Sequence, residues 1–104
     1  MELKVKVVEA TDVPKMDGPL GKSDPYVVLK LSSSQTEWKT KEQKNTLNPI
    51  WNEEFTIPID PKLDEILKVE MYDKDIKNDD FISRVLLRVN EIPEGLNDFN
   101  YTMH

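Results

Sequence analysis

Acidic side chains gather in two stretches of the sequence that are also rich in turn-forming residues. The first stretch holds Asp17 and Asp24 with two glycines between them. The second stretch combines aspartates with one asparagine: Asp73, Asp75, Asn78, Asp79 and Asp80. Calcium takes about six to eight oxygen ligands, mainly carboxylates and carbonyls, so both stretches carry suitable donor atoms. Neither stretch contains histidine or cysteine, which argues against zinc.

A calcium site would require these two distant stretches to meet, because the sequence lacks the spacing of a continuous EF-hand loop. Two like charges about 4 Å apart repel by roughly 4 kcal/mol at an effective dielectric constant of about 20. Carboxylates from both stretches in one pocket would therefore need a cation, bound protons or separation. The alternative interpretation is that they are solvated turn residues, since aspartate favours turns. Hydrophobic periodicity does not decide between the two.

Alternating apolar residues predict the strands that must position these loops. Period-two alternation, which is typical of half-buried strands, recurs over residues 3–7, 27–31, 55–59, 67–71 and 85–89. We expect a weaker, lysine-rich strand over residues 36–44, and we place Pro58 at a sheet edge or bulge because proline cannot donate to a ladder. Short strands separated by turn signals predict an all-β sandwich or barrel.

Composition describes one globular domain and excludes several function classes. The 104 residues, 38% hydrophobic and 33% charged, suit a single domain over residues 1–104. A net charge of −6 makes nucleic acid a poor partner. The absence of cysteine excludes disulfides and fits a reducing cytosol. The sequence shows no bilayer-spanning apolar run and no targeting peptide, so we expect membrane contact to be peripheral.

Candidate catalytic groups are scarce, and we expect no enzyme activity. The only histidine is the last residue, His104, and neither Ser23 nor Ser83 has a histidine nearby in sequence. No glycine-rich motif of the kind that cradles phosphates is present.

Three motifs resemble those of C2 domains, the family of the second conserved region of protein kinase C. Residues 22–27, Lys-Ser-Asp-Pro-Tyr-Val, resemble the SDPYV motif of that family. Residues 46–53 resemble its TLNPxWNE segment, and residues 72–75 with 80–82 resemble its YDxD and DF[IL]G motifs, with a serine in place of the final glycine. The motifs occur in the family's order, and the resemblance covers about residues 3–90.

The resemblance implies an eight-stranded antiparallel Greek-key β-sandwich in the strand order of phospholipase C, with calcium loops at one end. Little chain remains after residues 99–102 for a final strand, so we expect a fragment of a longer protein or an open sheet edge. The implied function is calcium-dependent binding of anionic phospholipid membranes by a cytoplasmic module that is recruited to the membrane surface. The alternative is a calcium-independent protein-interaction module.

By position, the resemblance assigns metal ligands to both acidic stretches. The glycine and the lysine in this set would contribute backbone carbonyls: Asp17, Gly18, Asp24, Asp73, Lys74, Asp75 and Asp80. The first stretch is longer and the second shorter than in many members of the family. Asp79 is therefore a rival to Asp80, and Asn78 falls near a position that sometimes adds a side-chain oxygen.

Apolar loop tips are the first candidate lipid contacts. Leu20 in the first stretch and Ile76 in the second could enter a bilayer, where burial of a leucine-sized side chain contributes roughly 1.5–3 kcal/mol. Lys22 and Lys77 lie beside them in sequence and could meet lipid phosphate. The alternative is that the apolar side chains fold back onto the sandwich.

A basic strand face is the second candidate lipid contact. Tyr26 and Lys30 share one face of their strand, and Lys39 and Lys41 share one face of the weaker strand. In some C2 domains the corresponding face binds phosphoinositide headgroups, and Lys39 and Lys41 match its paired lysines. The alternative is an ordinary solvated strand face.

Overall fold

The computed structural model of the chain describes residues 2–14, 23–60, 62–75, 78–92 and 96–102, the last of these by backbone alone. The described part contains seven strands and one short 3-10 helix. In chain order they are β1 (Glu2–Thr11), β2 (Pro25–Leu31), β3 (Glu37–Lys39), β4 (Ile50–Pro58), β5 (Ile66–Asp73), β6 (Asp80–Arg88), η1 (Val89–Glu91) and β7 (Leu96–Thr102).

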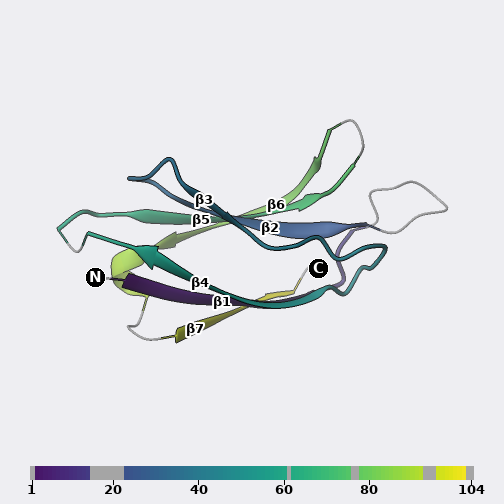
Figure 1. Ribbon diagram of the computed structural model, residues 1–104, viewed down its shortest axis with the longest axis horizontal. Coiled ribbons are helices and arrows are strands. Elements are labelled where there is room, and N and C mark those ends of the chain that lie inside the picture. Colours follow the sequence, from purple (N-terminus) through teal and green to yellow (C-terminus); the bar gives the residue numbers. More distant parts are fainter. Residues whose placement is uncertain (1, 15–22, 61, 76–77, 93–95, 103–104) are drawn as a thin grey trace.

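The strands form two sheets that pack face to face (Figure 1). One sheet has the order β4-β1-β7 and the other the order β3-β2-β5-β6. The predicted all-β sandwich is therefore confirmed, and Pro58 ends an edge strand, as expected from its missing amide proton. Seven strands are described, and an eighth is not among them.

The predicted antiparallel sandwich has one exception, since β7 runs parallel to β1. β6 runs toward the end of the sandwich at which β1 begins, and η1 follows it there (Figure 1). β7 therefore starts beside the beginning of β1, with Leu96 opposite Lys4, and follows it in the same direction.

The core lies between the sheets and follows the predicted alternation. In β2 the inward residues Val27, Leu29 and Leu31 are at most 3% exposed, while the side chains between them face outward. The apolar residues of β1 and β5 behave likewise. Trp51 belongs to this core, and Trp38 packs against it from β3. Burial of each large apolar side chain contributes roughly 1.5–3 kcal/mol, so this alternation accounts for the sandwich.

The strand expected over residues 36–44 is much shorter in the structure, because β3 covers only Glu37–Lys39. Thr40 ends the regular ladder: its hydroxyl oxygen accepts the amide of Val27 at 2.9 Å, while its own amide donates to the Val27 carbonyl at 2.9 Å. A side chain that bonds to the backbone in this way replaces a sheet contact. Lys41 consequently lies beyond the strand, and the expectation that it shares a strand face with Lys39 is wrong.

Candidate metal-binding end and outer sheet face

Three predicted acidic ligands lie at one end of the β3-β2-β5-β6 sheet. Asp24 directly precedes β2, Asp73 is the last residue of β5, and Asp80 is the first residue of β6. Asp73 stands opposite both Pro25 and Asp80 in the two antiparallel ladders. Because neighbouring antiparallel strands begin where their partners end, the sheet brings together residues from both acidic stretches (Figure 1).

Direct hydrogen bonds join the two stretches. The amide of Asp24 donates to Oδ1 of Asp73 at 2.8 Å, and the amide of Lys74 donates to the carbonyl of Asp24 at 3.1 Å. Asp73 is fully buried, whereas Asp24 is half-buried. A buried carboxylate that accepts an amide bond is held in one orientation, so this pair forms a fixed base for the acidic end.

Asp79 and Asp80 make different contacts. The carboxylate of Asp79 accepts hydrogen bonds from the hydroxyl of Tyr26 and, at 3.1 Å, from the amide of Asp75. Lys74 Nζ lies 3.6 Å from it. The Tyr26 hydrogen bond is the main reason that the pKa of Asp79 lies below its ordinary value. Burial, followed by this same bond, raises the pKa of Tyr26. Asp79 is thus engaged by Tyr26, while Asp80 stands beside Asp73.

The donor set suits a hard cation in kind, since the candidate side chains here are oxygen donors from aspartate. Among the described residues, no group of three or more acidic, histidine or cysteine side chains is close enough to hold a metal ion. Several predicted site residues lie outside the described residues: Asp17, Gly18, Leu20, Lys22, Ile76 and Lys77. Asp75 and Asn78 are described and exposed.

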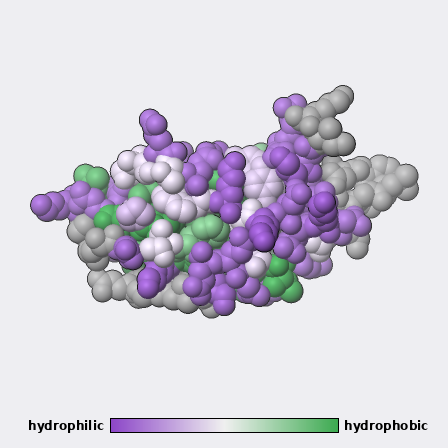
Figure 2. Space-filling view, viewed as in Figure 1, coloured by the Kyte–Doolittle hydropathy of each residue, from purple (hydrophilic) through white to green (hydrophobic). Residues whose placement is uncertain are grey.

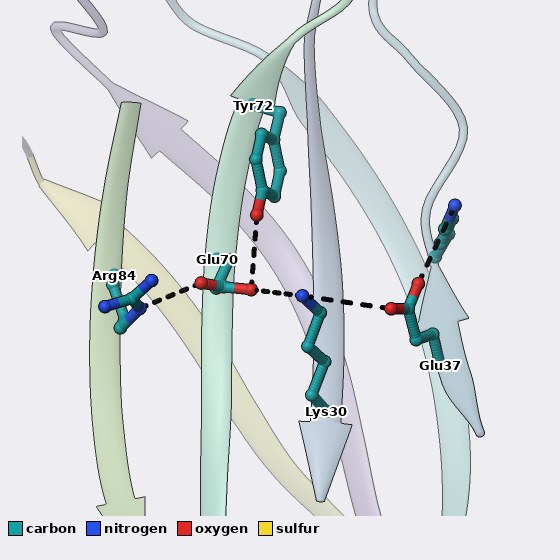
Figure 3. Close-up of polar contacts among 6 residues, drawn as sticks. Lys30, Glu37, Glu70, Tyr72 and Arg84 are labelled. Atoms are coloured by element: carbon teal, nitrogen blue, oxygen red, sulfur yellow. Dashed lines mark hydrogen bonds and ion pairs between the residues drawn. The ribbon is translucent and has the colours of Figure 1, made fainter. Parts of the chain in front are cut away.

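A charged network crosses the outer face of the same sheet, centred on Glu70. Figure 3 shows the Glu70 carboxylate between Arg84 on β6 and Lys30 on β2, each with a nitrogen 2.8 Å from a carboxylate oxygen. Tyr72 donates its hydroxyl to Glu70 at 3.3 Å. Burial raises the pKa of Glu70, but the bonds from Lys30 and Arg84 outweigh burial and leave that pKa below its ordinary value. The bond to Glu70 in turn raises the pKa of Lys30.

Only some residues of the predicted basic face lie together on one face of the sheet. Tyr26 and Lys30 lie on the outer side of β2, and Lys39 lies opposite Val28 in the β2–β3 ladder. Glu37 stands 3.8 Å from the ammonium groups of both Lys30 and Lys39. Figure 3 shows its contact with Lys30. Beside this face is a cleft of about 250 Å³ lined by Tyr26, Lys39, Thr40, Glu42, Lys74 and Asp79.

Glu37 and Glu70 are the site residues that the sequence analysis missed. Alternation places Glu70 on the outer face of β5, but a strand pattern carries no information about which residues on neighbouring strands stand beside it. Only the register, with Glu70 opposite Val28 and Arg84, brings positive charge to it. The lysines of the basic face are therefore partly neutralised by carboxylates that the pattern of lysines alone did not reveal.

Three aromatic rings pack in a row next to the acidic end of the sheet. The rings of Tyr26 and Tyr72 stack with centroids 5.7 Å apart, and Phe81 meets Tyr72 edge-on at 5.8 Å. The guanidinium of Arg84 lies 5.3 Å from the centre of the Phe81 ring. These contacts tie β2, β5 and β6 together where they carry the aspartates, and each aromatic pair contributes about 0.5–1.5 kcal/mol beyond area burial.

The surface visible in Figure 2 is largely hydrophilic, with apolar residues in small, separate patches. Among the described residues, the large hydrophobic side chains that are exposed are scattered over the fold: Ile50, Leu63, Phe81 and Leu86. In that same part of the chain, no helix is long and apolar enough to cross a membrane.

This sandwich, with its acidic strand ends, is a C2 domain. The family model described as "C2 domain" matches residues 1–102, and the chain belongs to that family. C2 domains of the synaptotagmin and cytosolic phospholipase A2 type are membrane-targeting modules. A C2 domain is itself non-catalytic, and those relatives that are enzymes owe their activity to other domains.

Individual relatives extend this result. The chain is 36% identical over 90 residues to Synaptotagmin-5 of Arabidopsis thaliana, a match that covers 86% of this chain and 16% of the relative. It is similar to human GIVD cytosolic phospholipase A2 in complex with methyl gamma-linolenyl fluorophosphonate, with a TM-score of 0.85, 35% identity, and coverage of 90% of this chain and 14% of that one.

A third match is the calcium-bound structure of a pair of C2 domains from Extended-Synaptotagmin 2. Its TM-score is 0.79 at 27% identity, with coverage of 86% of this chain and 35% of that one. In all three comparisons the chain spans only a minor part of the relative's length.

Proposed function

We propose that this C2 domain binds anionic phospholipid membranes in a calcium-dependent manner. The observation that carries the proposal is the junction of Asp24 and Asp73, which brings one aspartate from each acidic stretch to the same end of a sheet. Asp80 stands in register with Asp73 and extends this acidic end across a third strand. The calcium-bound state of a C2 relative that is 27% identical supports the same assignment.

The proposed ligands are the aspartates of both stretches: Asp17, Asp24, Asp73, Asp75 and Asp80. The backbone carbonyls of Gly18 and Lys74 would add further oxygens. Bound calcium would offset the negative charge of this end and leave coordination positions for lipid phosphate oxygens. The buried Asp73 and the paired strand ends would keep the donors in place, so binding would require little rearrangement of the sheet.

Lipid contacts belong to the same proposal. Leu20 and Ile76 would enter the bilayer from the loop tips, and Lys22 and Lys77 would meet phosphate. The outer face with Tyr26, Lys30 and Lys39 would take a phosphoinositide headgroup, and Lys41, which follows β3 in the chain, would add a further positive charge. On this proposal the domain resides in the cytoplasm and moves to a membrane surface when calcium rises.

The test begins with calorimetric titration of calcium into metal-free protein. Sedimentation with vesicles of phosphatidylcholine, with and without phosphatidylserine, follows in calcium and in chelator. We expect sedimentation only with phosphatidylserine and calcium together. Asp73→Asn should weaken calcium binding severely, whereas Lys39→Ala, a change on the outer face, should leave calcium affinity nearly intact. Absence of calcium binding, or vesicle binding that a chelator does not reduce, would overturn the proposal and favour a calcium-independent protein-interaction module.

A further inference from the structure

Residues 45–48, here called the clamp segment, contact the chain on both sides of the first acidic stretch. On the side where that stretch begins, the amide of Val13 donates to the carbonyl of Leu47 at 2.9 Å. The amide of Asp12 donates to Oδ1 of Asn48 at 3.2 Å. Both bonds hold the backbone that leads from β1 into the stretch.

On the side where the stretch ends, the clamp segment reaches a proposed metal ligand itself. The amide of Thr46 donates to the carbonyl of Ser23 at 2.8 Å, and the amide of Asn45 donates to Oδ1 of Asp24 at 2.7 Å. The second bond is short and involves a carboxylate, which makes it one of the stronger kinds of hydrogen bond. Ser23 is fully buried and donates its hydroxyl to the carbonyl of Pro14 at 2.6 Å, which links the two sides of the stretch directly.

An unusual backbone conformation orients the Asn45 amide toward the carboxylate of Asp24. Asn45 has φ of 53°, in the left-handed region that asparagine and glycine visit most readily. Residues with a β-branched side chain disfavour this region strongly. The identity of residue 45 therefore affects whether the amide points at the Asp24 carboxylate.

Asp24 is fixed by contacts from two separate loops. Its backbone is held from the second acidic stretch, through the Asp73 carboxylate and the Lys74 amide. Its side chain is held from the clamp segment, through the Asn45 amide. A half-buried carboxylate would otherwise sample several rotamers, and ordering it only on binding costs affinity.

We propose that Asn45 is a positioning residue for the metal site, and that its left-handed backbone orients the Asp24 carboxylate before a cation arrives. The inference rests on the proposed calcium-dependent function. It assigns a role to the connection between β3 and β4, which contributes no acidic ligand to the proposed site. It also gives a physical reason for the start of the motif at residues 46–53, because residues 46–48 form bonds to both sides of the first stretch.

The test compares three variants of the chain. Asn45→Val disfavours the left-handed backbone, and Asn45→Gly permits it. Asn52→Val is the matched control, because Asn52 also has a positive φ, of 50°, but lies within β4 in the other sheet. Calcium dissociation constants are measured by calorimetry and melting temperatures by circular dichroism.

We expect Asn45→Val to weaken calcium binding about tenfold, the size of effect expected for losing one hydrogen bond to a charged group. Asn45→Gly should retain an affinity within about threefold of the original chain, since glycine adopts a positive φ without steric cost. Asn52→Val should lower the melting temperature and leave calcium affinity unchanged. Unchanged affinity in Asn45→Val, with the original chain binding calcium normally, would overturn the inference.

A second measurement needs no calcium and remains available if Asn45→Val fails to fold. Amide hydrogen exchange by NMR should show the residue 45 amide to be protected in the metal-free original chain and exposed in Asp24→Ala. Equal exchange rates in the two proteins would contradict the contact. If the original chain bound no calcium at all, the proposed function would fail and the inference with it, while the exchange result would still report on the hydrogen bond.

Discussion

Lys30 Nζ lies 2.8 Å from a carboxylate oxygen of Glu70, although Glu70 is only 2% exposed. The second oxygen of Glu70 meets Arg84 Nε at the same distance. A buried carboxylate is therefore shared by cations from both neighbouring strands of the sheet. The positive charge of Lys30 on the outer face is largely balanced by the carboxylate of Glu70. This ion pair therefore affects both the stability of the domain and the attraction of the outer face for anions.

Glu70→Gln should destabilise the domain. The substitution removes the carboxylate that lies 2.8 Å from both Lys30 and Arg84, although Lys30 keeps Glu37 at 3.8 Å. The loss of a charged hydrogen bond in a buried position costs about 1–3 kcal/mol. A larger loss is not expected, because Lys30 and Arg84 are 36% and 50% exposed and water compensates them in part. Urea unfolding monitored by tryptophan fluorescence measures the change. Glu37→Gln, at a carboxylate that is 42% exposed, is the control and should cost less than about 1 kcal/mol.

The acid stability of the domain should depend on Glu70. Its pKa is lowered in the folded protein from the ordinary 4.5, so its contribution to folding is present above that value. The contribution disappears as pH falls through the lowered folded pKa, because the unfolded chain takes up the proton first. The free energy of unfolding should therefore fall more steeply below pH 4.5 in the original chain than in Glu70→Gln. Parallel pH profiles for the two proteins would contradict this assignment.

The choice between Asp79 and Asp80 as a calcium ligand can be decided by two matched substitutions. Asp79 already accepts bonds from Tyr26 and from the amide of Asp75, whereas Asp80 stands in register with Asp73. We expect Asp80→Asn to weaken calcium binding at least about tenfold, since a charged ligand is lost. Asp79→Asn should change the affinity by less than about threefold. Calorimetric titration distinguishes the two, and the reverse order of effects would assign the ligand to Asp79.

Binding of phosphoinositide to the outer face should be limited by Glu37. This carboxylate stands 3.8 Å from the ammonium groups of Lys30 and Lys39 and reduces their attraction for a phosphate. Glu37→Gln should therefore strengthen sedimentation with vesicles that contain phosphatidylinositol bisphosphate, by about threefold to tenfold in apparent affinity at low salt. Lys39→Ala should weaken it. If neither substitution has an effect, the headgroup does not bind at this face.

Most of the strands could be predicted from the sequence, since each of these shows alternating apolar and polar residues over its own range. The stretches expected around residues 3–7, 27–31, 55–59, 67–71 and 85–89 all lie on strands, although the third extends one residue beyond β4 and the last extends one residue into η1. The predicted extent of β3 was too long, because the hydrogen bond of a threonine side chain to the neighbouring strand ends β3 early. The alternation did not predict β7, since Leu96 is out of step with Phe99 and Tyr101 and the two aromatic residues alone give too short a period-two pattern.

The amino-acid sequence by itself determined the family and the types of donor atom that the chain offers, because three ordered motifs and two clusters of oxygen donors can be recognised locally. Only the tertiary structure decided which of those groups meet. The contact between Asp24 and Asp73 joins residues 49 positions apart, and the contact between Asn45 and Asp24 joins residues 21 apart. A strand pattern specifies which face a side chain takes, but the partner across that face depends on the register between strands that lie far apart in the chain. For that reason the sequence shows Glu70 only as one of several outward-facing residues, whereas the structure shows it at the centre of the network on the outer sheet face.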